Sequence, residues 1–424
     1  MKYYSTNDKN EKTSFKEVVF NGLASDGGLY MPEKVPVLSE SFLKAKNIPL
    51  HEIGFEVSKK FIGDEINSNE LQNIISDSLN FIIPLMPLDE HILSLELFHG
   101  PTLAFKDVGA RFMAKMLSLF SRNESKQLTI LTATSGDTGS AVANAFYEQE
   151  GIKVVILFPK NGVTDFQMKQ MTSLGKNISA IAIEGTFDDC QRLVKKSFSD
   201  IELMKSLSLT SANSINIARL IPQTFYFLFA YSLMKNKSDQ IIFSVPCGNF
   251  GNLTAGVMAK RMGMDAKFIA ATNSNNVFFE YLSTGVFSPR PSQKTISNAM
   301  DVGNPSNFYR LLDLYGNSHE KICNDISCYS ISDDETRVAM RNVFEEKKYI
   351  LDPHSAVACA ALKKNNSSGI FLATAHPSKF ESVVEETTGV KTVLPERVKN
   401  NFSDTVYEVN MSPDFESLKE YLLS

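Results

Sequence analysis

Three short segments contain the residues of this chain whose types and spacing could do chemistry. The first, SVPCGNFGNLTAG at 244–256, lies between an apolar run at 241–245 and a predicted helix at 253–262. Gly248 and Gly251 would allow a tight turn whose backbone N–H groups converge, and a helix N-terminus adds partial positive charge. These properties suit a phosphate group, although a plain glycine-rich turn from strand to helix gives the same pattern. The segment has neither the lysine of a P-loop nor a GxGxxG motif, which argues against ATP and NAD.

The second segment, TATSGDTGSAVANAF at 132–146, also runs from an apolar stretch into a predicted helix, which we expect to begin near Ser140. Its hydroxyls and free backbone amides suit an oxyanion, for example a carboxylate. Asp137 is unusual in such a loop, because its charge would repel the anion unless the side chain points elsewhere. A simple helix-capping turn is the alternative interpretation.

The third segment, HGPTLAFKDVGARFMAKMLSLF at 99–120, has apolar residues at helical spacing and so predicts a helix with one buried face. Lys106 lies in its first turn beside that face. Loss of solvent disfavours an ammonium group and lowers its pKa, as Schiff-base chemistry requires. A single lysine can instead extend its charged end into water. Taken together, however, a reactive lysine, a phosphate-binding turn and a second anion loop are the parts of a pyridoxal-phosphate site.

The elements that must position these segments follow from the apolar pattern. Short β-branched runs alternate with helical segments after residue 85, and they occupy 128–133, 154–158, 181–184, 241–245, 268–272 and 370–374. Such alternation predicts a largely parallel sheet, whose ligands bind beyond the carboxyl ends of the strands. Residues 1–85 differ, with polar turns and amphipathic helical patterns. We therefore predict an N-terminal domain at 1–85 and a catalytic domain at 86–424.

Composition sets further bounds. The 424 residues are 43% hydrophobic and 21% charged, as in ordinary globular proteins, and 43 basic against 48 acidic residues give a net charge of −5. This balance argues against a nucleic-acid partner. The five cysteines are scattered, which predicts neither a disulfide framework nor a metal site. The N-terminus lacks a signal-peptide pattern, and the apolar run at 220–234 is too short to span a membrane. We expect a cytoplasmic protein.

Several motifs together resemble those of the threonine synthase family, which belongs to the tryptophan-synthase-β-like (fold type II) group of pyridoxal-phosphate enzymes. The motifs that carry the resemblance are HGPTLAFKD (99–107), ATSGDTGSA (133–141), EGTFDDCQ (184–191), NSINIARL (213–220), PCGNFGN (246–252), DVGNPSN (301–307) and TAHPSKF (374–380). The segment at 15–36 resembles the N-terminal domain of that family. The resemblance implies an α/β fold of two subdomains with parallel sheets flanked by helices, plus an N-terminal α+β domain.

The resemblance also implies roles for individual residues. Lys106 matches the lysine that holds the cofactor covalently and then moves protons. Thr374 matches the hydroxyl residue near the pyridine nitrogen. The family's cofactor-phosphate cup corresponds to Gly248, Asn249, Phe250, Gly251 and Asn252. The loop that receives the amino-acid end of the substrate corresponds to Ser135, Gly136, Asp137, Thr138 and Gly139.

The reaction implied is conversion of O-phospho-L-homoserine and water to L-threonine and phosphate. The leaving phosphate needs a cationic site of its own, because Arg or Lys matches a dianion better than amides do. Candidates are Lys160, Arg111 and Arg219, and we expect Arg219 and Lys160 to be the stronger ones. The polar residues that accompany Arg219 in its motif are Asn213, Ser214 and Asn216. His99, His354 and His376 lie in family-like motifs, but their settings favour structural roles.

Two alternatives remain open at this stage. Other fold type II enzymes, such as threonine or serine dehydratases and cysteine synthases, resemble one another in having Asn in a Ser-Gly-Asn loop, where this chain has Asp137. They also lack the long N-terminal domain. A non-catalytic relative that only binds would not need Lys106, the cup and Thr374 together. A serine hydrolase is disfavoured, since the chain has no Gly-x-Ser-x-Gly motif.

We expect a monomer or a weak homodimer.

Overall fold

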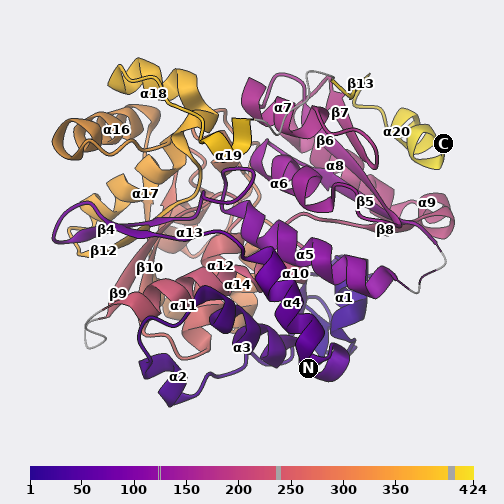
Figure 1. The fold of residues 1–424 in the computed structure, drawn as a ribbon, viewed down its shortest axis with the longest axis horizontal. Coiled ribbons are helices and arrows are strands. Elements are labelled where there is room, and N and C mark those ends of the chain that lie inside the picture. The colour runs from indigo at the N-terminus through magenta and orange to yellow at the C-terminus, as the bar shows by residue number, and fades with distance from the viewer. Residues whose placement is uncertain (123, 125, 235–239, 400–405) are drawn as a thin grey trace.

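Two parallel sheets organise the chain in the computed structural model, which describes residues 1–424 except 123, 125, 235–239 and 400–405. Their strand orders are β11-β10-β9-β12-β4-β3 and β13-β7-β6-β5-β8. Only β3 runs antiparallel to its neighbour among the described strands of these sheets. Each sheet is covered by helices, so the fold is the predicted α/β arrangement of two subdomains (Figure 1).

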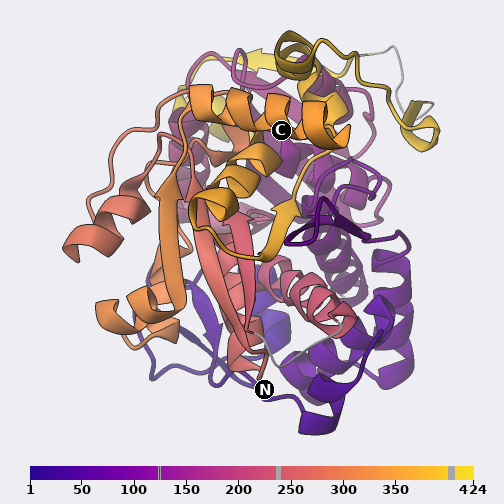
Figure 2. The same cartoon turned by 90° about the vertical axis from the view of Figure 1, so that its left-hand side faces the viewer.

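The larger sheet carries the phosphate-cup segment. Its strands, seen side by side in Figure 2, are β3 (Leu85–Pro87), β4 (Ile92–Glu96), β9 (Ile241–Pro246), β10 (Ala266–Thr272), β11 (Ile326–Ser330) and β12 (Gly369–Ala373). The associated helices are α11 (Gln223–Leu233), α12 (Gly251–Arg261), α13 (Val277–Thr284), α14 (Phe308–Leu314), α15 (His319–Asp325), α16 (Asp333–Lys347), α17 (Pro353–Lys364), α18 (Glu381–Thr388) and α19 (Glu396–Lys399), with 3-10 turns η2 (Asn298–Met300) and η3 (Pro377–Phe380). The runs predicted as strands at 241–245, 268–272 and 370–374 all lie in this sheet.

The smaller sheet carries the substrate-loop segment. Its strands are β5 (Leu128–Ala133), β6 (Ile152–Pro159), β7 (Ile178–Ile183), β8 (Ser208–Thr210) and β13 (Glu408–Met411). The associated helices are α5 (Lys106–Ser121), α6 (Asp137–Phe146), α7 (Asp165–Thr172), α8 (Phe187–Ser199), α9 (Ile201–Ser206), α10 (Ile217–Leu220) and α20 (Phe415–Leu423). Strand β13 pairs in parallel with β7, so the end of the chain returns to complete this sheet.

The N-terminal segment forms a small unit against both subdomains. It contains β1 (Tyr3–Ser5), β2 (Tyr30–Pro32), α1 (Phe15–Asn21), α2 (Glu40–Lys44), α3 (Leu50–Ile62), η1 (Gly63–Glu65) and α4 (Ser68–Ser78). Strands β1 and β2 pair antiparallel, and the apolar residues of this unit join one continuous core with those of α5 and α11. The two termini lie on opposite sides of the molecule in both views (Figures 1 and 2). The predicted boundary at residue 85 coincides with the start of β3 and stays a prediction.

Local sequence explains the helices that border the site. Thr186 caps α8 through a reciprocal pair of hydrogen bonds with Asp189, as its Thr-x-x-Asp pattern predicts. Helices α6 and α12 begin at Asp137 and Gly251, earlier than expected near Ser140 and Leu253, and neither has a side-chain cap at its N-terminus. Their first N–H groups are therefore left for other partners.

Among the described residues, no helix is long and apolar enough to cross a bilayer. Within the same residues, no group of three or more His, Cys, Asp or Glu side chains is placed to hold a metal ion.

Candidate active site

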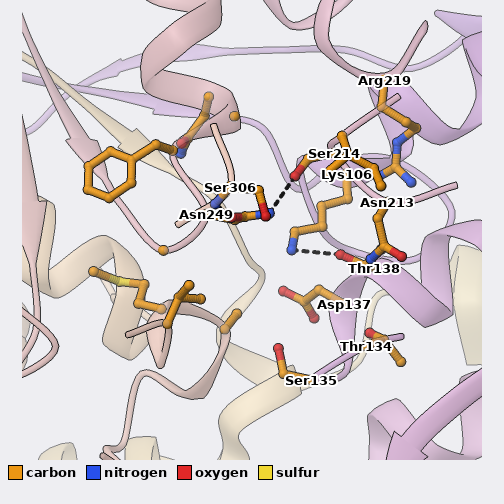
Figure 3. Close-up of a pocket in the computed structure, with 18 of the residues that line it drawn as sticks. Lys106, Thr134, Ser135, Asp137, Thr138, Asn213, Ser214, Arg219, Asn249 and Ser306 are labelled. Atoms are coloured by element: carbon orange, nitrogen blue, oxygen red, sulfur yellow. Dashed lines mark hydrogen bonds between the residues drawn. The ribbon is translucent and has the colours of Figure 1, made fainter. Parts of the chain in front are cut away.

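One pocket lies where strands of both sheets end. Its wall includes Ala133 at the end of β5, Pro246 at the end of β9 and Thr374 just after β12. Parallel strands bring their carboxyl ends to one edge, so the loops that follow them meet in a single place. The pocket thereby brings together all three segments identified in the sequence (Figure 3).

Lys106 is the first residue of α5 and projects into the pocket. Its Nζ donates a hydrogen bond to Thr138 Oγ1 at 2.8 Å (Figure 3). Burial lowers the pKa of Lys106 to about 8; the charge of Asp137 opposes this shift, while Arg219 and Lys379 add to it. The amine is therefore partly unprotonated near neutral pH, as expected for a lysine that forms a Schiff base.

The turn after β9 forms a cup of backbone amides. Phe250 adopts the left-handed conformation at φ 58°, which turns the chain into α12. Gly248 is required for close approach, because a Cβ there would lie 2.6 Å from the carbonyl oxygen of Ala299. A Cβ at Gly251 would lie 3.3 Å from Ser214 Cβ, which is tight but not an overlap, so Gly248 and Phe250 constrain the turn more strongly than Gly251 does. Among the described residues, the N–H groups of Gly248, Asn249, Phe250 and Gly251 find no acceptor.

These unpaired amides at a helix N-terminus fit a phosphate group. Side chains keep the cup in shape, because Asn249 donates to Ser214 Oγ at 2.9 Å and accepts from the Ser306 N–H (Figure 3). Asn252 also lines the pocket, although its side-chain amide donates to the Pro246 carbonyl at 2.8 Å. The cup, Lys106 and Thr374 lie around one pocket, which is what a pyridoxal phosphate would require.

The loop predicted to receive the substrate is only partly available. Thr134 Oγ1 already accepts from the N–H groups of Gly136 and Gly139, so these amides are not free, and neither glycine lines the pocket. Gly136 has φ 130° and passes so close to Gln167 that a side chain would not fit. Ser135, Asp137 and Thr138 do face the pocket.

Asp137, the unexpected charge in this loop, is neutralised by a lysine. Its Oδ1 lies 2.9 Å from Lys379 Nζ and accepts from Gln167 Nε2 at 2.9 Å. Burial opposes ionisation of Asp137, but the nearby charges of Lys379, Lys106 and His354 outweigh it and hold the pKa at about 2. Lys379 belongs to the TAHPSKF motif, but nothing in that motif indicates a partner in a distant loop.

Arg219 is the predicted cation that reaches the pocket. Gly109 on α5 makes room for it, since a Cβ there would lie 3.1 Å from Arg219 Nε. The guanidinium donates to the Ala212 carbonyl, while its buried Nε has no partner among the described residues. Burial lowers the pKa of Arg219 to about 10, so the group remains charged at neutral pH. A buried donor without a partner is suited to an incoming anion.

The residues that accompany Arg219 separate into two groups. Asn213 and Ser214 line the pocket (Figure 3). Asn213 bonds to the backbone of Ala133, and its amide group donates to the Ala133 carbonyl at 2.7 Å. Asn216 does not line the pocket, because it caps α10 and its amide donates to the Val19 carbonyl at 2.8 Å.

The other two predicted cations lie elsewhere. Lys160 is exposed, pairs with Glu184 at 3.4 Å and is not part of the pocket wall. It follows β6, whose end is displaced from the pocket. Arg111 donates to the carbonyls of Asp77 and Ser78 on the far side of α5. Of the three predicted cations, the structure therefore brings Arg219, and not Lys160 or Arg111, into the pocket wall.

One face of α8 was missed by the reasoning from sequence. Phe187, Gln191 and Lys195 recur every four residues along this helix and line the pocket. Lys195 is exposed and adds a second cation, besides Arg219, to the residues that line the pocket. The motif EGTFDDCQ includes the first two of these residues, and helical spacing from Phe187 is the signal that would have indicated the third.

His354 also lines the pocket and has a structural position. Its Nδ1 lies 2.8 Å from Asp352 Oδ1, and its Nε2 accepts from the N–H of Ala299 at 3.1 Å. This arrangement holds the turn η2 against the cup, as the structural interpretation of this histidine predicts. His99 and His376 bond to Glu96 and Ser378.

Comparisons with known families agree along the whole chain. Residues 85–371 match the family described as pyridoxal-phosphate dependent enzyme. Residues 2–79 match the threonine synthase N terminus, and residues 355–422 match the threonine synthase C-terminal region.

Individual relatives are similar over their full lengths. A threonine synthase from Buchnera aphidicola subsp. Schizaphis graminum is 43% identical, with all of both chains covered. The crystal structure of threonine synthase from Escherichia coli has a TM-score of 0.93 at 40% identity, covering 100% of this chain and 99% of that one. A structure of threonine synthase from Brucella melitensis with bound pyridoxal phosphate has a TM-score of 0.92 at 34% identity, over 100% of this chain and 99% of the other.

Proposed function

The chain belongs to the threonine synthase family, and we propose that its pocket converts O-phospho-L-homoserine and water to L-threonine and phosphate. The predicted family, fold class and pyridoxal-phosphate cofactor are confirmed by the comparisons. The roles of single residues are proposals, and each rests on the contacts described above.

The pocket would hold the cofactor at three points. The amides of the cup at 248–251 would bind its phosphate, Lys106 would bond to its aldehyde carbon, and Thr374 would face its ring nitrogen. When bound, pyridoxal phosphate supplies an electron-withdrawing ring that stabilises negative charge on the carbons of the attached amino acid. The Thr374 hydroxyl is too weak an acid to keep a ring nitrogen protonated, so it would moderate this withdrawal.

Lys106 then moves protons. A pKa of about 8 leaves its Nζ able to accept a proton near neutral pH and to return it later in the reaction. Thr138 holds this amine at 2.8 Å and so fixes its direction within the pocket. The hydroxyl of Ser135 and the backbone around Thr138 would receive the substrate carboxylate.

The substrate phosphate would bind on the Arg219 side of the pocket. Arg219 lines the pocket and offers a buried Nε donor without a partner. A charged donor at this point stabilises the leaving dianion more than neutral amides would. Lys195 lies on the α8 wall and would add long-range attraction for the same anion.

The proposed function depends most on Lys106, so substitution of this residue is its test. Lys106→Ala should reduce turnover by roughly 10³-fold or more, because it removes both the covalent anchor and the base. The same variant should lose the visible absorbance of the protein-bound cofactor. Lys115→Ala is the matched control, since Lys115 lies on the same helix but pairs with Asp77 at the surface at 3.1 Å. Normal turnover by Lys106→Ala would rule the assignment out.

The cellular location and the oligomeric state of the enzyme are also proposals. We propose a cytoplasmic enzyme that is a monomer or a weak homodimer and has no nucleic-acid partner. All five cysteines are free thiols, which supports a reducing compartment.

A further inference from the structure

Lys379 is a buried lysine in η3 whose ammonium group lies between the two subdomains. Its side chain is 0% exposed, and its Nζ contacts Asp137 Oδ1 at 2.9 Å. The same Nζ donates to the Thr102 carbonyl at 2.8 Å and to Gln170 Oε1 at 3.0 Å. All three donors of the ammonium therefore have an oxygen partner, which is the condition for burying such a charge.

These partners come from different parts of the fold. Lys379 follows β12 of the larger sheet, whereas Asp137 begins α6 and Gln170 lies in α7, both beside the smaller sheet. Thr102 is in the loop before α5, four residues before Lys106. One side chain thus connects the larger subdomain to the starts of the two helices that present Lys106 and the substrate loop.

Asp137 would otherwise work against the proposed reaction. It faces the pocket beside Ser135 and Thr138, where the substrate carboxylate would bind. An unpaired carboxylate at this place would repel that anion. It would also attract the proton of Lys106 and so raise the pKa of the base. With Lys379 at 2.9 Å the pair has no net charge.

We propose that Lys379 is a positioning residue for the reaction: it neutralises Asp137, so that the 135–139 loop can receive an anionic substrate. This inference rests on the proposed function. It makes Asp137 and Lys379 a single neutral unit, in which either charge alone is harmful and the loss of both is tolerated.

The charges around Lys106 support a pH signature for this unit. Asp137 raises the pKa of Lys106, whereas Arg219 and Lys379 lower it, and His354 acts on Asp137 from α17. The buried Asp107 on α5 interacts with Lys379 and Arg219 and stays in place in every variant. Lys106 accepts a proton only when it is unprotonated, so activity should rise with pH through its pKa. Because Lys379 lowers the pKa of Lys106, loss of Lys379 alone should move the rise in activity to higher pH. Loss of both charges removes two opposing effects, of which that of Asp137 is the larger, so the rise in activity should return to its original pH or lie below it.

A double-mutant cycle tests the proposal on the cofactor-loaded enzyme. The variants are Lys379→Met, Asp137→Asn and the two combined, measured by kcat/KM for O-phospho-L-homoserine, by the pH midpoint of activity and by thermal unfolding. Lys379→Met should lower kcat/KM by more than about tenfold and raise the pH midpoint by about one unit. The double variant should regain most of both losses and unfold at a higher temperature than Lys379→Met.

Lys419→Met is the matched control. Lys419 lies on α20, outside the pocket wall, and its Nζ is 3.0 Å from Asp200 Oδ2. This substitution should leave the pH midpoint of activity unchanged. A Lys379→Met enzyme with normal KM and pH midpoint, or a double variant no better than Lys379→Met in either kinetics or unfolding, would overturn the proposal. If Lys379→Met does not fold, a folded and active double variant supports the neutral unit and an unfolded one contradicts it. Inactive wild-type enzyme would instead overturn the proposed function, and the unfolding temperatures would still test the pair.

Discussion

At the scale of single residues, the pocket contains hydrogen-bond donors that have no acceptor among the described residues. Arg219 Nε is buried without a partner, and the cup amides of Gly248 and Asn249 have no acceptor among the described residues. A buried donor without a partner costs free energy, so Arg219 Nε indicates a ligand that satisfies it, whereas the half-exposed cup amides are simply free to bind one. We therefore assign the substrate phosphate to Arg219 and the cofactor phosphate to the cup.

This separation predicts different effects at Arg219 and Lys160. Arg219→Met should lower kcat/KM for O-phospho-L-homoserine by about 10- to 100-fold, the range expected for one lost charged hydrogen bond. Its affinity for pyridoxal phosphate should change little. Lys160→Met serves as control, because Lys160 pairs with Glu184 at the surface, and should be close to wild type. A larger loss of cofactor affinity than of substrate affinity in Arg219→Met would reverse the assignment of the two phosphate sites.

The sequence predicted the pocket residues that lie close to the end of a strand or helix. It did not predict those whose position depends on contacts with residues distant in sequence. Lys106, the cup and Thr374 all lie within a few residues of a strand or helix end, and the structure places them around the pocket. Lys160 also follows a strand, yet β6 ends away from the pocket. Asn216 has the right chemistry, but its side chain is used to cap α10. Lys379 was missed because its partner lies more than 200 residues earlier in the chain.

At the scale of elements, Arg310 connects the N-terminal unit to the substrate side of the pocket. It is fully buried in α14 and has no carboxylate partner among the described residues. Its guanidinium donates to the carbonyls of Tyr30 in β2 at 3.1 Å, Ser214 at 3.0 Å and Ile215 at 2.6 Å. Burial lowers its pKa to about 9. The N-terminal unit therefore braces the loop that precedes Arg219.

We predict that this brace contributes to stability and to substrate binding together. Arg310→Met should lower the free energy of unfolding by about 2–4 kcal/mol, because several buried carbonyls lose their donor. It should also lower kcat/KM, since the segment from Ser214 to Arg219 loses its support. The measurements are urea denaturation and steady-state kinetics. Arg261→Met is the control, because Arg261 is exposed and donates to a single carbonyl, that of Leu314. An Arg310→Met enzyme as stable as this control would exclude the brace.

At the scale of the whole molecule, two sheets share one active site, and segments distant in sequence complete each of them. The alternation of apolar runs and helical segments was enough to predict the α/β class, since buried parallel strands are nearly continuous runs of apolar residues. Strands β3, β4, β8, β11 and β13 of the two sheets were not predicted. None is longer than five residues, and all but β4 lie at sheet edges, where the apolar signal is weak. The division into two sheets likewise depends on pairing that sequence order does not reveal.

The proposed conversion of O-phospho-L-homoserine to L-threonine can be measured by following both products of the purified, cofactor-loaded enzyme. O-phospho-L-homoserine is the only substrate supplied, and inorganic phosphate and L-threonine are measured in the same reaction. We predict that phosphate and threonine appear in equal amounts and that Lys106→Ala forms neither. Phosphate accompanied by 2-oxobutanoate in place of threonine, or no product from a visibly cofactor-loaded protein, would contradict it.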